Sequence, residues 1–306
     1  MARRRRPRGR NIQGILLFDK PCGMSSNKAL QEVKQIFFAQ KAGHTGSLDP
    51  LATGLLPVCF GNATRVSSFL LDADKRYQVV CQLGQTTTTG DAEGELVETR
   101  PVGELQVDQV RSLLQADFTG TISQIPPMHS ALKQNGQRLY ELARKGIEVE
   151  REPRQVTIFD LELVAIEADQ MRLNIHCSKG TYVRTLVEDI GKALGVGAHV
   201  KELRRTAVGP FEEPVTMYTL DQLRQLKETD VKSLDGLLLP AESALEQYPP
   251  IHLDEDSAFY MRQGQAIQVP RAPTGGWVRL YEGEQHFMGM GAIQDDGKVA
   301  PKRLFS

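Results

Sequence analysis

The sequence predicts an α+β protein with a large N-terminal domain and a small β domain at its C-terminal end. Strand-like and helix-like segments alternate, without an internal repeat, from residue 14 to about residue 245. The stretch "QYPPIHLDED" at 247–256 combines two prolines with an acidic cluster and marks a boundary. Residues 257–306 hold short strands separated by Gly and Pro turns, a pattern typical of a small barrel or sandwich. A chain of 306 residues is long enough for two such domains.

The first elements follow from apolar spacing. Residues 14–20 are strand-like, and Ser25 or Ser26 can cap a helix over residues 27–39. In that helix, apolar side chains recur at helical spacing at Leu30, Val33 and Ile36. The glycine-rich stretch 41–61 predicts a loop, and residues 76–84 predict a strand that a polar turn follows.

The later elements are predicted in the same way. Residues 106–117 are helical, and residues 124–146 begin as a proline-stiffened loop and continue as a basic amphipathic helix. Residues 151–167 and 171–180 predict a pair of strands, and a glycine turn at 180 leads into a helix that ends near 195. Residues 219–226 predict a capped helix.

The charge is unevenly distributed along the chain. The net charge is −1, yet "RRRRPRGR" at 3–10 carries six arginines and no acid, while residues 212–256 carry eleven acids and three bases. We expect residues 1–10 to be a disordered basic arm that either contacts phosphates or keeps the chain in solution. No apolar run approaches the roughly 18 residues of a membrane helix, and no apolar signal segment follows the arginines. Four cysteines without a CxxC pair indicate a reducing, cytoplasmic location.

The stretch "KAGHTGSLDPLATGLLPVCFG" at 41–61 contains a single acid, Asp49. Its glycines let a substrate approach the backbone closely, and its prolines stiffen the chain. A catalytic carboxylate needs such a fixed, accessible position. On composition alone the simpler interpretation is structural, because an Asp-Pro pair among glycines is common in turns.

Several longer motifs occur in a fixed order: "FDKPCGMSS" (18–26), "GHTGSLDPLATGLL" (43–56), "GNATR" (61–65), "DKRYQV" (74–79), "QIPPMHSALK" (124–133), "CSKGTYVRTL" (177–186) and "GAHVKELRRTAVG" (197–209). Together they resemble the TruB family of tRNA pseudouridine-55 synthases, over roughly residues 11–300. The resemblance implies a catalytic domain at 11–250 with a mixed, largely antiparallel sheet flanked by helices. It also implies a thumb insertion at about 124–152 and a PUA-like β domain at 251–306.

The resemblance implies isomerisation of uridine 55 in the T loop of tRNA to pseudouridine, through base flipping and a catalytic aspartate. It implies no cofactor and no metal, which suits a chain without a phosphate-binding or dinucleotide-binding motif. The expected partner is the T arm of tRNA, with no membrane and no obligate protein partner, and the chain is expected to act as a monomer. Whether the aspartate attacks C1′, attacks C6 or promotes elimination to a glycal stays open.

The resemblance also assigns residues. The catalytic group comprises Asp49, its arginine partner Arg184, and Tyr77, the candidate base that packs on the target uracil. Taken singly, Arg184 would be a surface ion pair and Tyr77 an ordinary strand tyrosine. The substrate-binding group comprises His44, which inserts at the extruded nucleotide, and Tyr182, Leu203, Lys20 and Arg65. The candidate RNA contacts on the thumb are His129, Lys133, Arg144 and Lys145, and His129 stands where the family usually has Tyr.

Two other functions compete with this prediction. A non-enzymatic RNA-folding protein would use the same cleft to bind and unfold the T arm, and its binding would survive the loss of Asp49. A metal-assisted hydrolase would use His44, Asp49, His176 and His199. Their spacing matches no common zinc motif, and insensitivity to a chelator would exclude this hypothesis.

Overall fold

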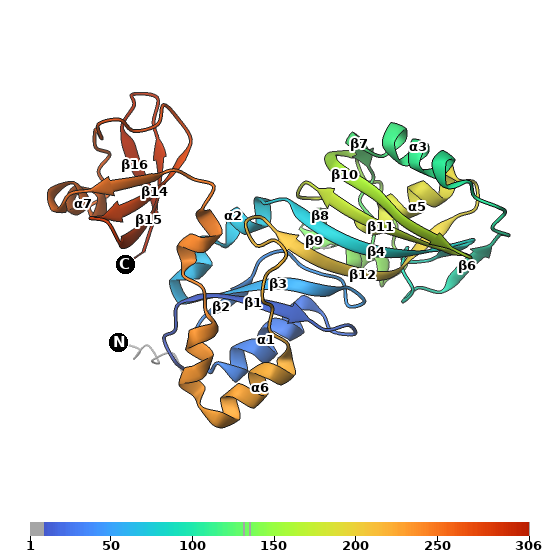
Figure 1. The fold of residues 1–306 in the computed structure, drawn as a ribbon, viewed down its shortest axis with the longest axis horizontal. Helices are drawn as coiled ribbons and strands as arrows, with labels where there is room; N and C mark the ends of the chain where they lie inside the picture. The colour runs from blue at the N-terminus through green and yellow to red at the C-terminus, as the bar shows by residue number, and fades with distance from the viewer. Residues whose placement is uncertain (1–8, 131, 135, 306) are drawn as a thin grey trace.

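The computed structural model describes residues 9–130, 132–134 and 136–305, so residues 1–8 of the predicted basic arm lie outside the described residues. Figure 1 shows two bodies, a large one built on a curved sheet and a small one at the C-terminal end. At the end of the predicted arm, Arg10 is held on the large body: its backbone N donates to the Phe38 carbonyl (2.6 Å), and its side chain pairs with Asp235.

The large sheet has the strand order β1-β3-β12-β4-β11-β10-β7, with β2 paired to β3. In this order the path strands are Gly14–Lys20, Thr53–Phe60, Ala198–Val208, Lys75–Leu83, Gln170–Cys177, Arg154–Glu167 and Gly120–Gln124, and β2 is Ala42–His44. All pairings are antiparallel except β12 with β3, which joins only at Arg204–Thr53 and Arg205–Gly54. The predicted mixed, largely antiparallel sheet is confirmed, and its two halves meet at one short parallel junction.

Helices cover one face of this sheet and enclose the larger core. They are α1 (Ser26–Ile36), α3 (Val107–Asp117), α5 (Val183–Ala193) and α6 (Leu220–Thr229). Figure 1 shows α1 and α6 beneath β1 and β3, and α3 and α5 beside the other half. A second core lies on the other face of β1 and β3, against the short helices η1 (Gly61–Arg65), α2 (Ser67–Asp72) and η3 (Ala241–Leu245). None of the described helices is long and apolar enough to span a bilayer.

The two serines before α1 have different roles. Ser25 is the N-cap, and its side chain accepts a hydrogen bond from the Lys28 backbone N (3.3 Å). The buried Ser26 hydroxyl instead donates to the Leu48 carbonyl (3.0 Å) and accepts from the Leu48 amide (2.7 Å). The start of α1 is therefore bonded to the residue that precedes Asp49.

The segment predicted as a basic helix over part of 124–146 forms mostly a hairpin. Strands β8 (Lys133–Gln134) and β9 (Gln137–Arg138) pair, and only Leu139–Ala143 form a helix, α4. Gly136 has a φ of 82° in the hairpin turn, and Gly146 has a φ of 70° after the helix. These left-handed conformations interrupt a continuous helix, which is why the predicted helix was too long.

The small domain is a four-stranded sheet with one helix. The strands are β13 (Pro250–Leu253), β14 (Trp277–Glu282), β15 (His286–Ile293) and β16 (Val299–Leu304), in sequential order. The helix α7 (Glu255–Arg262) was not predicted from the sequence. The Asp254 carboxylate caps it by accepting from the Ser257 amide (2.8 Å), so the acidic cluster at 254–256 begins a helix. The domain packs on α2, where the Phe69 ring lies 5.0 Å from Trp277 and 5.3 Å from Tyr248.

The junction between the sheet halves gives a first prediction. Gly54 has a φ of 95°, and a Cβ there would lie 2.2 Å from the Arg205 carbonyl oxygen. Gly54→Ala must therefore separate β3 from β12, and we expect it to lower the free energy of unfolding by about 3 kcal/mol. Gly23→Ala is the matched control, since its φ is 76° but nothing lies within 4 Å, and it should cost only about 1 kcal/mol. Equal denaturant midpoints for the two variants would contradict this.

Candidate active site

Asp49 lies in the loop between β2 and β3, and several bonds fix this loop. Its carbonyl accepts from the Ala52 amide (3.1 Å), which closes a turn at 49–52. The neighbouring Pro50 carbonyl accepts from the Gly23 amide (2.9 Å) and from the Lys20 Nζ (3.2 Å). The Asp49 carboxylate itself remains 40 % exposed, so it has both the fixed position and the access that a catalytic acid needs.

Lys20 is a fully buried cation at the base of this loop. Its Nζ donates to the carbonyls of Pro21 (2.8 Å), Met24 (2.6 Å) and Pro50 (3.2 Å). Burial lowers the pKa of Lys20 to about 8, although the charge of Asp49 opposes this shift. Because its donors are engaged by backbone carbonyls, Lys20 shapes the loop around Asp49.

Arg184, in the first turn of α5, is the partner of Asp49. Its Nε lies 2.9 Å from Asp49 Oδ2. Its Nη1 donates to the Thr89 carbonyl (2.9 Å) and its Nη2 to the His129 carbonyl (2.8 Å). The side chain is only 6 % exposed. One guanidinium thus joins the Asp49 loop, the turn after β5 (Gln85–Thr87) and the first part of the thumb.

A second acid, which the sequence analysis missed, faces the same guanidinium. Asp91 is buried, and its Oδ2 lies 3.7 Å from Arg184 Nε. Its Oδ1 accepts from the Thr89 hydroxyl (2.6 Å) and the Glu93 amide (3.1 Å). In the sequence Asp91 stands in "TTTTGDAEG", which looks like an ordinary polar turn, and the only available signal was a lone Asp between Gly and Ala.

The electrostatics of Asp49 follow from these neighbours. Burial raises the pKa of Asp49 above its usual value, the adjacent Arg184 guanidinium lowers it, and the charge of Asp91 raises it again. The net direction is upward, so Asp49 loses its charge at a higher pH than an ordinary aspartate does.

This gives a second prediction. If Asp49 acts as a carboxylate, activity is complete above its pKa and is lost as the pH falls through that raised value. Asp91→Asn removes a charge that raises this pKa, so the acidic limb of the pH–rate profile should move to lower pH, whatever happens to the maximal rate. A limb that moves to higher pH or stays fixed would show that Asp91 does not act on Asp49 in this way.

Tyr77, on β4, lies opposite Arg205 of β12 in the strand register. Because the two residues are directly opposed across the strands, their side chains leave the same face of the sheet. Burial raises the pKa of Tyr77, and the Arg205 charge opposes that shift. The charge of Asp49 also raises the pKa of Tyr77.

The structure brings His44, Tyr182 and Leu203 to the same region. His44 ends β2, and its buried Nδ1 has no hydrogen-bond partner among the described residues; burial and then Arg205 lower its pKa. Tyr182 is the N-cap of α5, two residues before Arg184. Burial raises the pKa of Tyr182, and the charge of Arg184 opposes this shift. Leu203 is buried on β12, with its carbonyl 3.4 Å from the Thr53 hydroxyl.

Arg65 lies elsewhere. It ends η1, its Nη1 donates to the carbonyl of Leu304, and its own carbonyl accepts from Arg303 Nη1 (2.7 Å). The Arg303 guanidinium also lies 5.5 Å from the centroid of the Phe69 ring. Arg65 therefore joins the large body to the small domain, and the structure does not place it beside Asp49.

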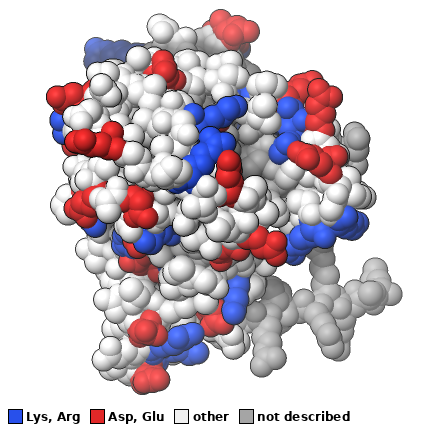
Figure 2. Space-filling view, turned by 90° about the vertical axis from the view of Figure 1, so that its right-hand side faces the viewer, with Lys and Arg blue, Asp and Glu red and all other residues white. Residues whose placement is uncertain are grey.

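The thumb carries exposed positive charge. Lys133 is on β8, and Arg144 and Lys145 follow α4; all three are exposed. The Arg144 guanidinium lies 5.5 Å from the centroid of the Tyr140 ring. His129 is half-buried and reaches the site through its carbonyl bond to Arg184. Figure 2 shows Lys and Arg side chains gathered around a hollow in the upper part of one face, with acidic side chains among them.

The four residues of the competing metal-site hypothesis do not form a cluster. The His199 Nδ1 lies 3.1 Å from the Gln85 carbonyl oxygen, and the His176 ring packs against Phe159 at 4.9 Å. Within the described ranges, no three His, Cys, Asp or Glu side chains lie close enough together to hold a metal ion. The four cysteines are free thiols.

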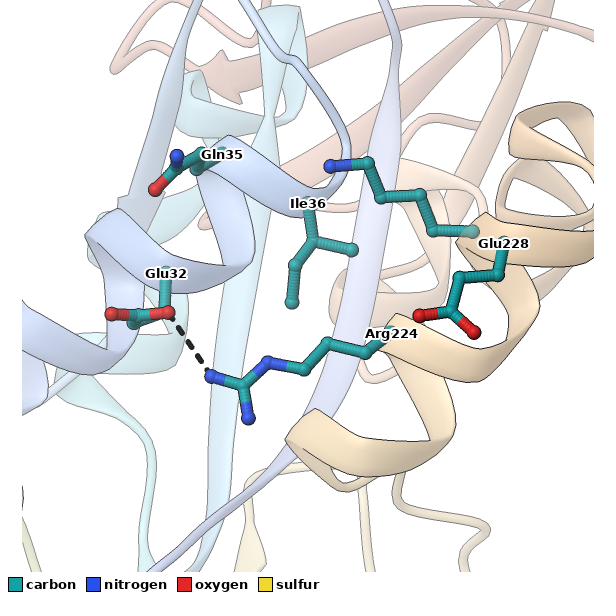
Figure 3. A pocket seen from close by; sticks show the side chains of 6 residues that line it. Glu32, Gln35, Ile36, Arg224 and Glu228 are labelled. Carbon is teal, nitrogen blue, oxygen red and sulfur yellow. Dashed lines mark hydrogen bonds and ion pairs between the residues drawn. The ribbon is translucent and has the colours of Figure 1, made fainter.

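A crevice at the other end of α1 is separate from this site. It is about 400 Å³ in volume and lies between α1 and α6, as Figure 3 shows. Glu32 and Arg224 form an ion pair across it (3.3 Å). None of the predicted site residues lines it.

Known protein families match nearly the whole chain. Residues 34–183 match the TruB family pseudouridylate synthase N-terminal domain. Residues 184–246 match the tRNA pseudouridylate synthase B C-terminal domain, and residues 249–305 match the C-terminal model of pseudouridine synthase II TruB. A relative from Nitrosococcus oceani, named tRNA pseudouridine synthase B, is 57 % identical over 99 % of this chain and 98 % of its own length. One of the same name from Stutzerimonas stutzeri is 54 % identical over 96 % of each chain.

Solved structures agree with this match. The chain is similar to one in the crystal structure of a Cbf5-Nop10-Gar1 complex, with a TM-score of 0.75 and 28 % identity over 97 % of this chain and 86 % of that one. It is also similar to a chain in an H/ACA RNP bound to a substrate RNA containing 2′-deoxyuridine, with a TM-score of 0.72 and 26 % identity over 96 % and 85 % of the two chains. The predicted fold and family are confirmed: this chain belongs to the TruB family of pseudouridylate synthases.

Proposed function

We propose that this protein converts uridine 55 in the T loop of tRNA to pseudouridine. The single observation that carries the proposal is the pairing of Asp49 with the buried Arg184, 2.9 Å apart, at a loop that Lys20 and Ser26 hold in place. The names of the relatives, tRNA pseudouridine synthase B, support the choice of tRNA as substrate. The reaction moves the glycosidic bond from N1 to C5 and needs no redox step.

The residues divide the work between them. Arg184 orients Asp49 and favours its charged form, so that the carboxylate can attack C1′ or C6 or take a proton on the way to a glycal. All three routes end with loss of the proton at C5, and Tyr77 is the base for that step. Each route therefore uses the same two residues, with Asp49 acting first and Tyr77 last.

The target base must leave the RNA stack to reach Asp49. A uridine in a folded loop is inaccessible while it is stacked, so it has to be flipped out. His44 has a half-buried imidazole, suited to the space that the base leaves, and Tyr182 and Leu203 supply an aromatic and an apolar wall for the uracil. The thumb cations contact phosphates and position the RNA without selecting its sequence.

The test is tritium release from a tRNA transcript that carries [5-³H]uridine. We expect the purified chain, alone in a reducing buffer and with EDTA present, to release tritium in proportion to the pseudouridine formed. The matched control is a transcript in which cytidine replaces uridine 55, and it should release none. Binding of both transcripts without any release would reject the isomerase and favour the RNA-folding hypothesis. Release that EDTA abolishes would favour a metal-assisted enzyme.

A third prediction concerns the thumb. Lys133 and Lys145 are exposed, so replacing both with Ala should weaken tRNA binding and reduce the slope of log K against log salt by about one for each phosphate that the variant no longer neutralises. The control is Lys227→Ala, on α6 in the crevice away from Asp49, and it should change neither quantity. Filter binding across a salt series measures both. An unchanged slope in the double variant would remove these two lysines from the RNA interface.

A further inference from the structure

Arg205 is a fully buried side chain that the sequence analysis did not single out. It lies on β12, two residues after Leu203, and is only 1 % exposed. Burying a guanidinium is costly unless its donors are satisfied and its charge is balanced. Its position beneath the Asp49 loop therefore needs an explanation in terms of what it contacts.

Three structural elements meet at Arg205. Its Nε donates to the Leu55 carbonyl of β3 (2.8 Å), and its Nη2 donates to the Gly46 carbonyl of the Asp49 loop (3.1 Å). Across the β4–β12 ladder Arg205 lies directly opposite Tyr77, so the two side chains leave the same face of the sheet. Burial lowers the pKa of Arg205, and the neighbouring Tyr77 phenol opposes this shift.

We propose that Arg205 is a positioning residue that holds Tyr77 ready to accept the C5 proton and fixes it relative to the Asp49 loop. The proposal rests on the proposed function, since it gives a role to a residue in that reaction. Arg205 touches no substrate in this role and acts through Tyr77. Its hydrogen bonds to the Gly46 and Leu55 carbonyls fix the position of Tyr77 relative to the Asp49 loop.

The chemistry of the last step explains why a guanidinium is suited to this place. The Tyr77 phenolate oxygen takes the proton from C5, and the electron pair of that C–H bond re-forms the C5–C6 double bond. The π pair of the C6–N1 double bond moves onto N1, which takes a proton from water. The phenol then returns its proton to solvent. A partly buried phenol is a poor source of phenolate, and an adjacent permanent cation stabilises the anion. Without Arg205 the phenolate fraction at neutral pH would be smaller.

Other charged or titratable groups around this pair come from several elements. Cys177 of β11 and Asp49 also raise the pKa of Tyr77. Arg205 lowers the pKa values of Lys20, His44 and Lys75, which belong to β1, β2 and the start of β4. Cys177 is held neutral, because burial raises its pKa to about 11. Rate alone cannot separate a role of Arg205 at Tyr77 from an effect on these groups, so the test follows the C5 proton.

The experiment compares the intact protein with Arg205→Gln and Arg205→Lys on tRNA whose uridine carries hydrogen or deuterium at C5. The matched control is Arg204→Lys, the neighbouring arginine, which instead pairs with Asp19 (2.9 Å). Single-turnover pseudouridine formation is measured across pH, with thermal unfolding and tRNA binding for each variant. Arg205→Lys retains a positive charge in case the Gln variant does not fold.

For Arg205→Gln we expect a rate about tenfold lower near neutral pH. The limb of the pH–rate profile that rises as Tyr77 becomes a phenolate should move to higher pH by about one unit. A C5 deuterium isotope effect should appear or increase, because proton removal becomes rate-limiting. Arg205→Lys should lose rate with a smaller shift of the limb, and Arg204→Lys should match the intact protein. A folded Arg205 variant that binds tRNA but shows neither a shifted limb nor an isotope effect would overturn the proposal. If the intact protein itself forms no pseudouridine, the proposed function fails instead.

Discussion

Replacing Asp49 with Asn is expected to abolish pseudouridine formation while tRNA binding persists. Asn keeps the size and shape of Asp but is neutral and a poor nucleophile, so every route open to the carboxylate is closed. Losses for essential catalytic groups are large, and we expect the single-turnover rate to fall by a factor of about 10⁴ or more. Tritium release and filter binding, measured on the same preparations, separate the two effects.

The same variant should fold at least as well as the intact protein. The pKa of Asp49 is raised in the folded state, so the folded protein binds the proton more tightly than the unfolded chain does. At neutral pH the charged Asp49 carboxylate therefore slightly destabilises the folded state. This contribution to stability improves as the pH falls towards the raised pKa. Asn carries no such charge, so the melting temperature should be unchanged or higher. A large drop in melting temperature would mean that Asp49 is mainly structural, which is the interpretation that composition alone favoured.

The sequence identified the parts of the site that have local signals. Asp49 stands in a long motif, and a serine cap before α1 and a capped helix at 219–226 were predicted from a few neighbouring residues. In the structure Ser25 and Thr219 are these N-caps. Asp91 had no such signal, and Arg205 lies in the motif at 197–209 without anything local that sets it apart from Arg204. The importance of both depends on contacts with residues more than twenty positions away.

Arg204 and Arg205 show most clearly why the local sequence does not identify a buried residue of the site. Side chains alternate across a strand, so one of the two had to face inward, but nothing local says which one. In the structure Arg204 pairs with the partly exposed Asp19, whereas Arg205 is enclosed by β3, β4 and the Asp49 loop. Arg65 stands in the motif "GNATR", and in the structure its contacts are with Leu304 and Arg303 of the small domain.

Arg184→Met is expected to have the second largest effect, because it acts on both stability and activity. The guanidinium is nearly buried and donates to Asp49, Thr89 and His129. Its removal leaves the buried Asp91 beside Asp49 without a cation between them. Breaking a buried ion pair by removing one partner costs about 3–5 kcal/mol, so we expect a loss of this size in the free energy of unfolding.

Arg184→Lys separates geometry from charge. A lysine keeps the positive charge, but one ammonium group cannot reach an acid and two carbonyls that a planar guanidinium contacts in three directions. We expect activity about 100-fold lower than in the intact protein, with a smaller loss of stability than in Arg184→Met. Arg172→Lys, on the exposed side of β11, is the control and should retain full activity, since among the described residues its only carboxylate contact is the exposed Glu167 at 3.4 Å.

The thumb supplies an independent measurement of the same interaction. Arg184 pairs with Asp49 through Nε and donates to the His129 carbonyl through Nη2, so the side chain that orients Asp49 also anchors the first part of the thumb. In Arg184→Lys we therefore expect faster hydrogen exchange at the amides of residues 138–147 than in the Arg172→Lys control, even without RNA. Exchange that is unchanged, together with lost activity, would confine Arg184 to orienting Asp49. Faster exchange would show that thumb position and the catalytic pair are coupled through one side chain.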